Sequence, residues 1–346
     1  MNPIDPNAQP SAAAPATRLR DFIAGFVLSR AVYAAASFGI ADLLAKRPSD
    51  AEALARACGA DASALYRVLR ALASVGVFSE DDSGNFFNTS MSELLRSDVP
   101  GSLRALSLMY GDDDIWASWG LILHSVRTGD AGMNQVVGMH AFEHYARHPE
   151  KAKVFDQAMV SSSSLVNRAL TEAYDFSQFR RLVDVAGGYG STLSAVLKAT
   201  PGLRGVLYDM PHVIENAAAR IAEQGLADRC ELVAGNMFES VPAGADAYFM
   251  KHILHDWDDA HCGKILAAIH AAIPSHGRLL VSEKLILPGA SGYYGKITDL
   301  VMLVHNQGGR ERTEAEYRAL FARAGFKLIR IVPTVADHSL LEAVKA

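Results

Sequence analysis

Cysteine is scarce in this chain: among its 346 residues only Cys58, Cys230 and Cys262 are cysteines, and no two of them have C-x-x-C spacing. This pattern indicates neither a disulfide framework nor a zinc site, and free thiols fit a reducing cytoplasm, where we expect the protein to work. Long apolar runs are also missing, because none approaches the roughly 20 residues of a membrane span. The first ten residues, M-N-P-I-D-P-N-A-Q-P, contain no basic residue and do not resemble a secretory signal.

The chain also has no excess of positively charged residues. Lys and Arg number 33 against 38 Asp and Glu, a formal net charge of −5, which argues against a general polyanion binder. Half of the residues are hydrophobic and 21% are charged, as in an ordinary soluble globular protein. The length is large for one domain, so we expect two.

The first third of the chain has the pattern of a small helical domain. Residues 1–17 are rich in Pro, Ala and Ser and predict a disordered arm. Residues 18–104 have helical apolar spacing, and helices predicted at 51–57 and 62–75 precede two short strands around the turn at 81–84. Two helices followed by a hairpin form a winged-helix pattern.

A winged helix has two interpretations, sequence-specific DNA binding and a packing or dimerisation module. Between residues 50 and 104 the chain has five basic and eight acidic residues, whereas a DNA reader needs a positive face. The hairpin tip, where a basic wing would lie, reads Glu80-Asp81-Asp82. The charge therefore favours dimerisation over a DNA-binding regulator.

Residues 105–179 continue with helical spacing and carry aromatic and methionine side chains, among them Phe142, Phe155 and Met159. Such side chains usually fill a core. They also suit the wall of a pocket for an aromatic substrate, because a thioether packs well against ring edges. We expect a hinge before the last part of the chain, residues 180–346.

A strand, a glycine turn, a helix and a second strand follow one another between residues 181 and 211. The run L-V-D-V-A predicts a strand buried on both faces, and Gly187, Gly188 and Gly190 come directly after it. The second strand ends at Asp209, where a carboxylate can accept hydrogen bonds from both hydroxyls of a ribose. This unit predicts a nucleoside-containing cofactor, with a purely structural tight turn as the alternative.

The glycines do not match a dinucleotide site. They read G-G-Y-G with no third glycine, whereas dinucleotide sites usually have G-x-G-x-x-G and hold the pyrophosphate at the helix N-terminus. Asp184 also lies inside the first strand, and a carboxylate there suits a ligand with a cationic end. S-adenosylmethionine has such an end in its amino and sulfonium groups.

The rest of the chain alternates strands and helices, which predicts a doubly wound parallel sheet, with residues 288–297 as a loop. Ligands bind such a sheet beyond the carboxyl ends of its strands. The polar side chains expected there are Asp209, Asn236, Lys251, His252, His255, Asp256 and Glu283.

Two histidines are candidates for a base. Histidine is the side chain best suited to remove a proton near neutral pH, and Glu283 and Glu311 are carboxylates that can orient it. Spacing alone does not choose between His252 and His255. Asn236 begins the sequence N-M-F, whose amide and apolar side chains suit an adenine ring.

Six segments carry a family resemblance: L-V-D-V-A-G-G-Y-G, L-Y-D-M-P-H-V-I, G-N-M-F, M-K-H-I-L-H-D-W-D-D-A-H-C, S-E-K-L-I and G-G-R-E-R-T-E-A-E-Y-R-A-L. They closely resemble the S-adenosylmethionine-dependent O-methyltransferases of the caffeic acid and N-acetylserotonin type, to which bacterial natural-product enzymes also belong. The resemblance covers nearly the whole chain. It implies an α/β fold with a Rossmann-like catalytic sheet, an N-terminal winged-helix dimerisation domain, a homodimer, and methyl transfer to a small aromatic acceptor.

The resemblance also implies roles, with His255 as the general base and Glu283 and Glu311 beside it. Taken with the patterns above, the expected cofactor-binding residues are Asp184, Gly187, Gly188, Gly190, Asp209, Met210, Asn236, Met237, Phe238 and Lys251. The expected acceptor-binding residues are Met109, Phe142, Phe155, Met159, Asp256, Met302 and Asn306. We expect no metal, and no nucleic-acid or membrane partner.

Two departures from the family pattern leave the acceptor open. Asn236 stands where many relatives have Asp, and Ser162, in a run of four serines, stands where plant members often have His. Whether the methylated atom is oxygen or nitrogen is open as well. The alternative is a member that binds S-adenosylmethionine but catalyses a decarboxylation or a pericyclic step, against which the presence of His255, Glu283 and Glu311 argues.

Overall fold

The computed structural model describes residues 15–346, apart from the side chains of Ser162 and Leu165, and divides into a first unit up to Gly111 and a second from Asp112. Residues 1–14 of the expected disordered arm lie outside the described residues, while residues 15–17 already belong to helix α1 (Pro15–Ser37). The first unit extends past residue 104 because α6 (Arg104–Gly111) packs on α1, where Arg30 donates to the carbonyl of Gly111 at 2.7 Å.

The first unit has helices around a small antiparallel sheet in the order β1-β3-β2, which contains the predicted hairpin. Asp50 and Asp61 begin two helices, since their carboxylates accept the backbone N–H of Ala53 and Ala64 at 2.7 and 2.8 Å. The remaining elements are α2 (Ile40–Lys46), β1 (Ser49–Asp50), α3 (Ala51–Cys58), α4 (Ala62–Ser74), β2 (Phe78–Glu80), β3 (Asn85–Asn88) and α5 (Ser90–Glu93).

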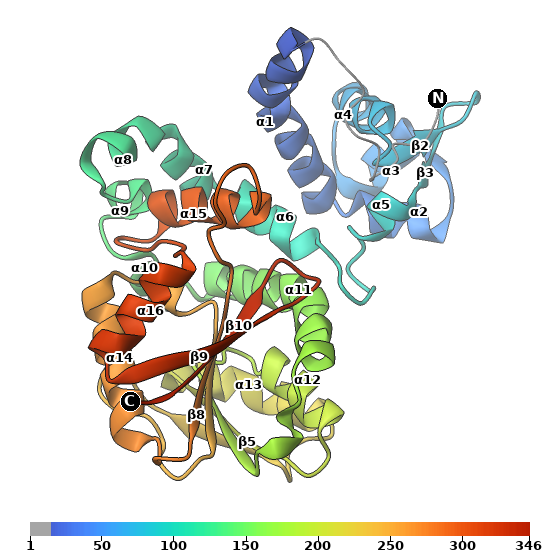
Figure 1. Ribbon diagram of the computed structural model, residues 1–346. Helices are drawn as coiled ribbons and strands as arrows, with labels where there is room; N and C mark the ends of the chain where they lie inside the picture. Colours follow the sequence, from blue (N-terminus) through green and yellow to red (C-terminus); the bar gives the residue numbers. More distant parts are fainter. Residues whose placement is uncertain (1–14) are drawn as a thin grey trace. The chain divides into compact units, whose positions relative to one another are not determined.

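The second unit begins with helices and continues with alternating strands and helices (Figure 1). The helices before the sheet are α7 (Asp113–Gly120), α8 (Ile122–Thr128), α9 (Gly132–Val137), α10 (Ala141–Arg147), α11 (Pro149–Ala173) and the 3-10 helix η1 (Phe176–Gln178). The sheet and its helices are β4 (Arg181–Val185), α12 (Ser191–Ala199), β5 (Arg204–Asp209), α13 (Pro211–Glu223), β6 (Cys230–Ala234), β7 (Ala247–Lys251), the 3-10 helix η2 (Leu254–Asp256), α14 (Asp259–Ala272), β8 (Arg278–Glu283), α15 (Tyr293–His305), α16 (Glu314–Arg323), β9 (Phe326–Pro333) and β10 (Ser339–Lys345).

The described strands of this unit form one sheet in the order β6-β5-β4-β7-β8-β10-β9. The strands from β6 to β8 run parallel, and β10 pairs antiparallel with both β8 and β9. This arrangement confirms the predicted Rossmann-like fold. The chain folds this way because its apolar strands must be covered on both faces, which connecting helices achieve.

Helices cover the two faces of the sheet separately (Figure 1). On one face, Val183, Tyr248 and Val281 pack against α14 and α16. On the other face, Leu207 and Phe249 pack against α12, α13 and the end of α11. The apolar clusters on the two faces do not cover the carboxyl edge of the parallel strands, where the polar side chains lie.

Residues 288–297 are not wholly a loop, so that prediction is wrong in part. Helix α15 begins at Tyr293, after Gly292 in left-handed backbone (φ 71°). The sequence of its first turns does not show the apolar spacing of a helix, because the apolar side chains of Tyr293, Tyr294 and Ile297 are exposed. Within the described chain no single helix is long and apolar enough to cross a membrane, although α1 and α2, bent by 56° at their break, pass that test as a pair.

Candidate functional site

Four parallel strands bring most of the predicted site residues to one edge of the sheet. The glycine turn follows β4, and Asp209 ends β5. Lys251 ends β7, with His252 and His255 just beyond it, and Glu283 ends β8. Because these strands are parallel neighbours or near neighbours, their carboxyl ends lie side by side, as predicted.

The glycine turn is built from left-handed backbone, with φ of 55° at Ala186, 59° at Gly188 and 73° at Gly190. A Cβ at Gly187 would lie 2.6 Å from the Oδ2 atom of Asp184, so this glycine is required by packing. A Cβ at Gly188 would meet no described atom within 4 Å. The turn therefore presents bare backbone to open space at Gly188.

The carboxylate of Asp184 is buried beside the turn, and within residues 15–346 its Oδ2 atom has no hydrogen-bond partner. Burial raises the pKa of Asp184 to about 7, against the attraction of Lys251. The Nζ atom of Lys251 donates to the hydroxyl of Ser163 at 2.8 Å, and burial lowers its pKa to about 8. One buried carboxylate oxygen thus remains available to a cationic ligand.

Asp209 is fixed by two backbone groups. Its Oδ2 atom accepts the N–H of Gly188 at 2.8 Å and its Oδ1 atom accepts the N–H of Met210 at 2.7 Å. Burial raises its pKa even though both N–H groups favour the charged form. Since each carboxylate oxygen has a second lone pair, Asp209 can still accept hydrogen bonds from a ligand.

The side chain of Asn236 is largely engaged in its own turn. Its Oδ1 atom accepts the N–H of Phe238 and its Nδ2 atom donates to Glu239, both at 3.0 Å. Met237 and Phe238 are half-buried, and Phe238 meets the ring of Trp257 edge-on at 4.8 Å between centroids. The predicted adenine contact would therefore rest more on these apolar side chains than on the amide.

His255 lies in η2 and is almost fully buried. Its Nδ1 atom is 2.8 Å from the Oε1 atom of Glu311 and 3.6 Å from the Oε2 atom of Glu283. Glu283 is held in turn, because its Oε1 atom accepts the backbone N–H groups of Ile253 and Leu254 at 3.1 and 3.0 Å. Both predicted orienting carboxylates therefore lie on the Nδ1 side of the imidazole.

The charges around His255 make it a strong proton acceptor. Burial favours the neutral ring, but the carboxylates of Glu283, Glu311 and Asp256 outweigh it and raise the pKa of His255 to about 10. Burial raises the pKa of Glu283 to about 7 and that of Asp256 to about 6, with His255 opposing both shifts. The carboxylates around the ring therefore stabilise its protonated form.

Three of the predicted acceptor-binding residues gather near the other side of the ring. The Nε2 atom of His255 is 3.5 Å from the Oδ1 atom of Asp256. The Nδ2 atom of Asn306 donates to that same oxygen at 2.5 Å and lies 3.5 Å from the sulfur of Met302. A hydroxyl that reaches Nε2 would therefore meet Asp256 and Asn306 as well.

The other predicted acceptor-binding residues fall into both units. Phe142 packs edge-on against Phe155, with 6.2 Å between ring centroids, and stacks near Trp257 at 5.8 Å. Met159 lies in α11, the helix that also carries Phe155. Met109 is buried in α6 of the first unit, and its assignment stays a prediction.

Three residues near this edge were missed as site residues. Ser163 binds Lys251, and the run of four serines was its only signal. His140 stacks on Trp257 with 5.0 Å between centroids and an angle of 2°. His338 contacts His252 across 86 positions of the chain, a separation that no local pattern reveals.

His255, Glu283 and Glu311 also offer three ligand atoms within 4.8 Å of one another, a spacing that could suit a metal ion. Two of those groups are already engaged, however. Glu283 accepts two backbone N–H groups, and the Nδ1 atom of His255 is bound to Glu311.

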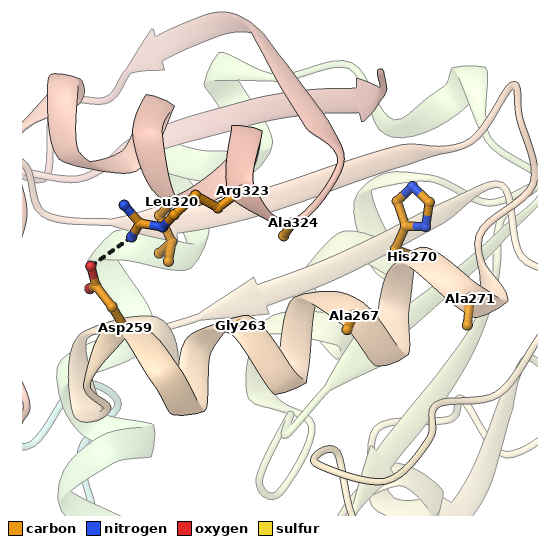
Figure 2. Close-up of a pocket in the computed structure, with 8 residues that line it drawn as sticks. All are labelled: Asp259, Gly263, Ala267, His270, Ala271, Leu320, Arg323 and Ala324. Carbon is orange, nitrogen blue, oxygen red and sulfur yellow. Dashed lines mark hydrogen bonds and ion pairs between the residues drawn. The ribbon is translucent and has the colours of Figure 1, made fainter.

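A separate hollow lies between α14 and α16 and contains none of the predicted site residues (Figure 2). Arg323 donates to Asp259 at 2.7 Å within it. Asp259 also pairs with Arg312 at 2.9 Å, so the carboxylate of this hollow is already engaged. Nothing in its chemistry points to a ligand.

A family model of the O-methyltransferase domain matches residues 119–327, and a model of the O-methyltransferase dimerisation domain matches residues 20–98. The chain belongs to this O-methyltransferase family. It is therefore an S-adenosylmethionine-dependent O-methyltransferase, as the six motifs predicted.

Relatives match this family member over almost its whole length. The phenazine O-methyltransferase of Lysobacter antibioticus is 42% identical over 94% of this chain and 95% of its own. A 3-amino-4-hydroxybenzoate 4-O-methyltransferase of Streptomyces cremeus is 38% identical over 97% and 92%. An 8-amino-8-demethylriboflavin N,N-dimethyltransferase of Streptomyces davaonensis is 35% identical over 98% and 97%.

Solved structures agree with the fold. The crystal structure of LaPhzM has a TM-score of 0.94 at 41% identity, over 96% of this chain and 100% of its own. Human N-acetylserotonin methyltransferase in complex with S-adenosylmethionine has a TM-score of 0.89 at 27% identity, over 98% and 100%.

The sheet edge of this O-methyltransferase fits the family cofactor. S-adenosylmethionine needs a negative charge for its cationic end, hydrogen-bond acceptors for its ribose and an apolar surface for its adenine. Asp184 offers a buried oxygen without a described partner, Asp209 offers spare lone pairs, and Met237 and Phe238 offer apolar surface. Each requirement of the cofactor is met by a different part of the edge.

Proposed function

We propose that this enzyme transfers the methyl group of S-adenosylmethionine to a hydroxyl group of a small aromatic or heteroaromatic secondary metabolite, with His255 as the general base. The observation that carries the proposal is the 2.8 Å hydrogen bond between the Nδ1 atom of His255 and Glu311. It orients the buried ring so that Nε2 is left for the acceptor. The relatives named for phenazine and 3-amino-4-hydroxybenzoate support this class of acceptor.

The cofactor, when bound, supplies an electrophilic methyl group on a cationic sulfur. Asp184, Asp209, Met237 and Phe238 would hold it, and Lys251 would stay with Ser163 behind them. Asp184 contributes charge, and Asp209 contributes acceptors for hydroxyl groups. The bare backbone at Gly188 allows close approach.

His255 removes the proton of the acceptor hydroxyl. In the neutral ring, Nδ1 donates to Glu311 and Nε2 carries the lone pair that takes the proton from the acceptor hydroxyl. The carboxylates of Glu283, Glu311 and Asp256 favour the protonated ring that this step forms. Stabilising the product of the proton transfer suits general base catalysis. Glu283 and Glu311 then stabilise the imidazolium.

The acceptor is positioned by the groups beside Nε2. Asp256 and Asn306 can hydrogen-bond a polar substituent next to the reacting hydroxyl, and Met302 can pack on the ring. Phe142 and Phe155 provide aromatic surface farther away. In a displacement reaction that needs alignment of the acceptor with the methyl group, such positioning supplies much of the rate.

Replacing His255 tests the proposal. His255→Ala is expected to lower methyl transfer by about 10²–10⁴-fold and to leave the affinity for S-adenosylhomocysteine unchanged. Turnover is measured as S-adenosylhomocysteine formed with 3-amino-4-hydroxybenzoate and a panel of hydroxylated phenazines, and affinity by calorimetry. Unchanged turnover in this variant would remove His255 from the role of base.

The same assay separates the alternatives. Mass spectrometry of the product distinguishes O- from N-methylation, which is relevant because a relative is named as an N,N-dimethyltransferase. A decarboxylase or a pericyclic catalyst would consume the acceptor without forming S-adenosylhomocysteine. That outcome would reject methyl transfer itself.

We also propose that the first unit is a winged-helix dimerisation domain and that the enzyme is a cytoplasmic homodimer. The three cysteines of the chain are all free, which suits a reducing compartment. Apolar side chains on α1 are exposed in the single chain, by 53 to 70% of their surface: Leu19, Phe22, Ile23, Phe26 and Val27. Such a face requires a partner, and the match to a dimerisation domain supports a second copy.

Charged substitutions on α1 test the dimer. Phe22→Asp combined with Phe26→Asp is expected to convert a dimer to a monomer in sedimentation velocity. The control Arg20→Asp, at another exposed position of the same helix, should leave the dimer intact. A wild-type monomer at micromolar concentration would contradict the proposal.

A further inference from the structure

His252, the histidine that the mechanism leaves unused, has an unusual backbone. Its φ is 57°, the left-handed region that a residue with a side chain seldom adopts. Its N–H donates to the carbonyl of Ser282 at 3.2 Å, and the next two N–H groups, of Ile253 and Leu254, bind Glu283. The strained residue thus turns the chain from β7 toward His255, and strain of this kind gathers at functional sites.

The ring of His252 lies flat against the ring of His255. Their centroids are 5.1 Å apart and their planes differ by 14°. Glu311 fixes only the Nδ1 edge of His255, so the hydrogen bond alone would allow the ring to tilt about that edge. A parallel ring beside it restricts this tilt.

His338 holds the far edge of His252, with a contact between the two Nε2 atoms. The Nδ1 atom of His338 is 2.7 Å from the carbonyl oxygen of Ala336, so Nδ1 carries its proton and its Nε2 atom accepts. His252 must then donate through Nε2–H. This assignment follows from the hydrogen bonds and fixes both tautomers.

The groups around this pair oppose its protonation. Lys251 at the end of β7, Lys284 after β8 and His255 in η2 act on both rings electrostatically as cations. Burial lowers the pKa of both His252 and His338, and these cations lower it further. The pair therefore stays neutral at the pH at which His255 gains a proton.

We propose that His252 and His338 are positioning residues for His255: His338 fixes the tautomer and plane of His252, whose ring keeps the Nε2 atom of His255 aimed at the acceptor. The proposal rests on His255 being the base of the proposed function. His252 itself takes no proton in the reaction, because burial and the nearby cations keep its ring neutral.

Two substitutions at one position test the hydrogen bond. His338→Leu removes the acceptor, and kcat is expected to fall about 10-fold, as for loss of an orienting partner at other histidine sites. His338→Gln offers a carbonyl oxygen in the same place and should retain most of the rate. Neither variant should change the KM for the acceptor or the affinity for S-adenosylhomocysteine. Equal losses in both variants would overturn the positioning role.

A nuclear magnetic resonance measurement on the unaltered enzyme keeps the inference testable if a variant does not fold. Histidines labelled with ¹⁵N, in the complex with S-adenosylhomocysteine, should show His252 protonated only at Nε2 and His338 only at Nδ1 between pH 6 and 8. A charged ring, or the opposite tautomer at either position, would refute the arrangement.

The two readouts distinguish failure of this inference from failure of the proposed function. If His255→Ala is fully active, the base is elsewhere, whatever the tautomers are. If His255→Ala is inactive and His338→Leu has the wild-type rate and pH profile, the base is correct and the positioning pair is not.

Discussion

The two ends of the sheet edge treat buried carboxylates in opposite ways. At β4 and β5, Asp184 has an oxygen without a partner in the described chain, and Asp209 is bound only by backbone N–H groups. Beyond β7 and β8, Glu283 at the end of β8 and Glu311 between α15 and α16 lie beside the Nδ1 atom of His255. The first end leaves negative charge for a cationic ligand, whereas the second pairs it with a side chain of the protein.

Under the proposed function, this difference separates cofactor binding from proton transfer. Buried charge without a partner is costly, so a ligand that neutralises it gains affinity. Buried charge around an imidazole instead stabilises the protonated ring, which lowers the free energy of proton transfer. Substitutions at the two ends should therefore change different measured quantities.

The largest expected effect is a loss of kcat when a carboxylate beside His255 is replaced. Glu311→Gln keeps a hydrogen-bond acceptor for Nδ1 but removes the charge, so the pKa of His255 should fall and kcat should drop about 100-fold or more. The affinity for S-adenosylhomocysteine should not change. The control is Glu314→Gln, an exposed glutamate on α16. A variant that lost cofactor affinity but not kcat would contradict the separation.

A smaller effect is expected at the β4 end. Asp184→Asn removes the negative charge that would pair with the sulfonium and amino groups of the cofactor. The dissociation constant for S-adenosylmethionine should therefore rise at least about 30-fold. At saturating cofactor, kcat should change much less. Calorimetry measures the affinity, with the exposed Asp228→Asn as control. Equal affinity in Asp184→Asn and the wild type would show that another group neutralises the cofactor.

The smallest effect is a dependence of cofactor affinity on pH. The pKa of Asp184 in the free enzyme is about 7, so its carboxyl is protonated below that pH. A cationic ligand favours the charged carboxylate, so affinity should be full above pH 7 and fall by up to about tenfold per pH unit below it. Asp184→Asn should lack this dependence. The affinity for S-adenosylmethionine is measured at pH 6, 7 and 8 in the wild type and in Asp184→Asn. The same dependence on pH in both proteins would assign the proton to another group.

Local patterns predicted much of the fold correctly. The hairpin near residue 81 and the strands of the sheet depend on neighbours in sequence. The first turns of α15 were missed because exposed tyrosines concealed the helical period there. Residues 15–17 were assigned to a disordered arm on composition, yet they belong to α1.

The sequence by itself determined the family, the nucleoside-type glycine turn and the list of polar residues at the strand ends, since a parallel sheet must bring those ends to one edge. Spacing did not separate the two histidines, whereas the tertiary structure gives each of them a different partner. His255 meets Glu311, 56 positions away, and His252 meets His338, 86 positions away. Such contacts depend on the order of the strands and on which way each side chain points, and neither is encoded within a local stretch of sequence.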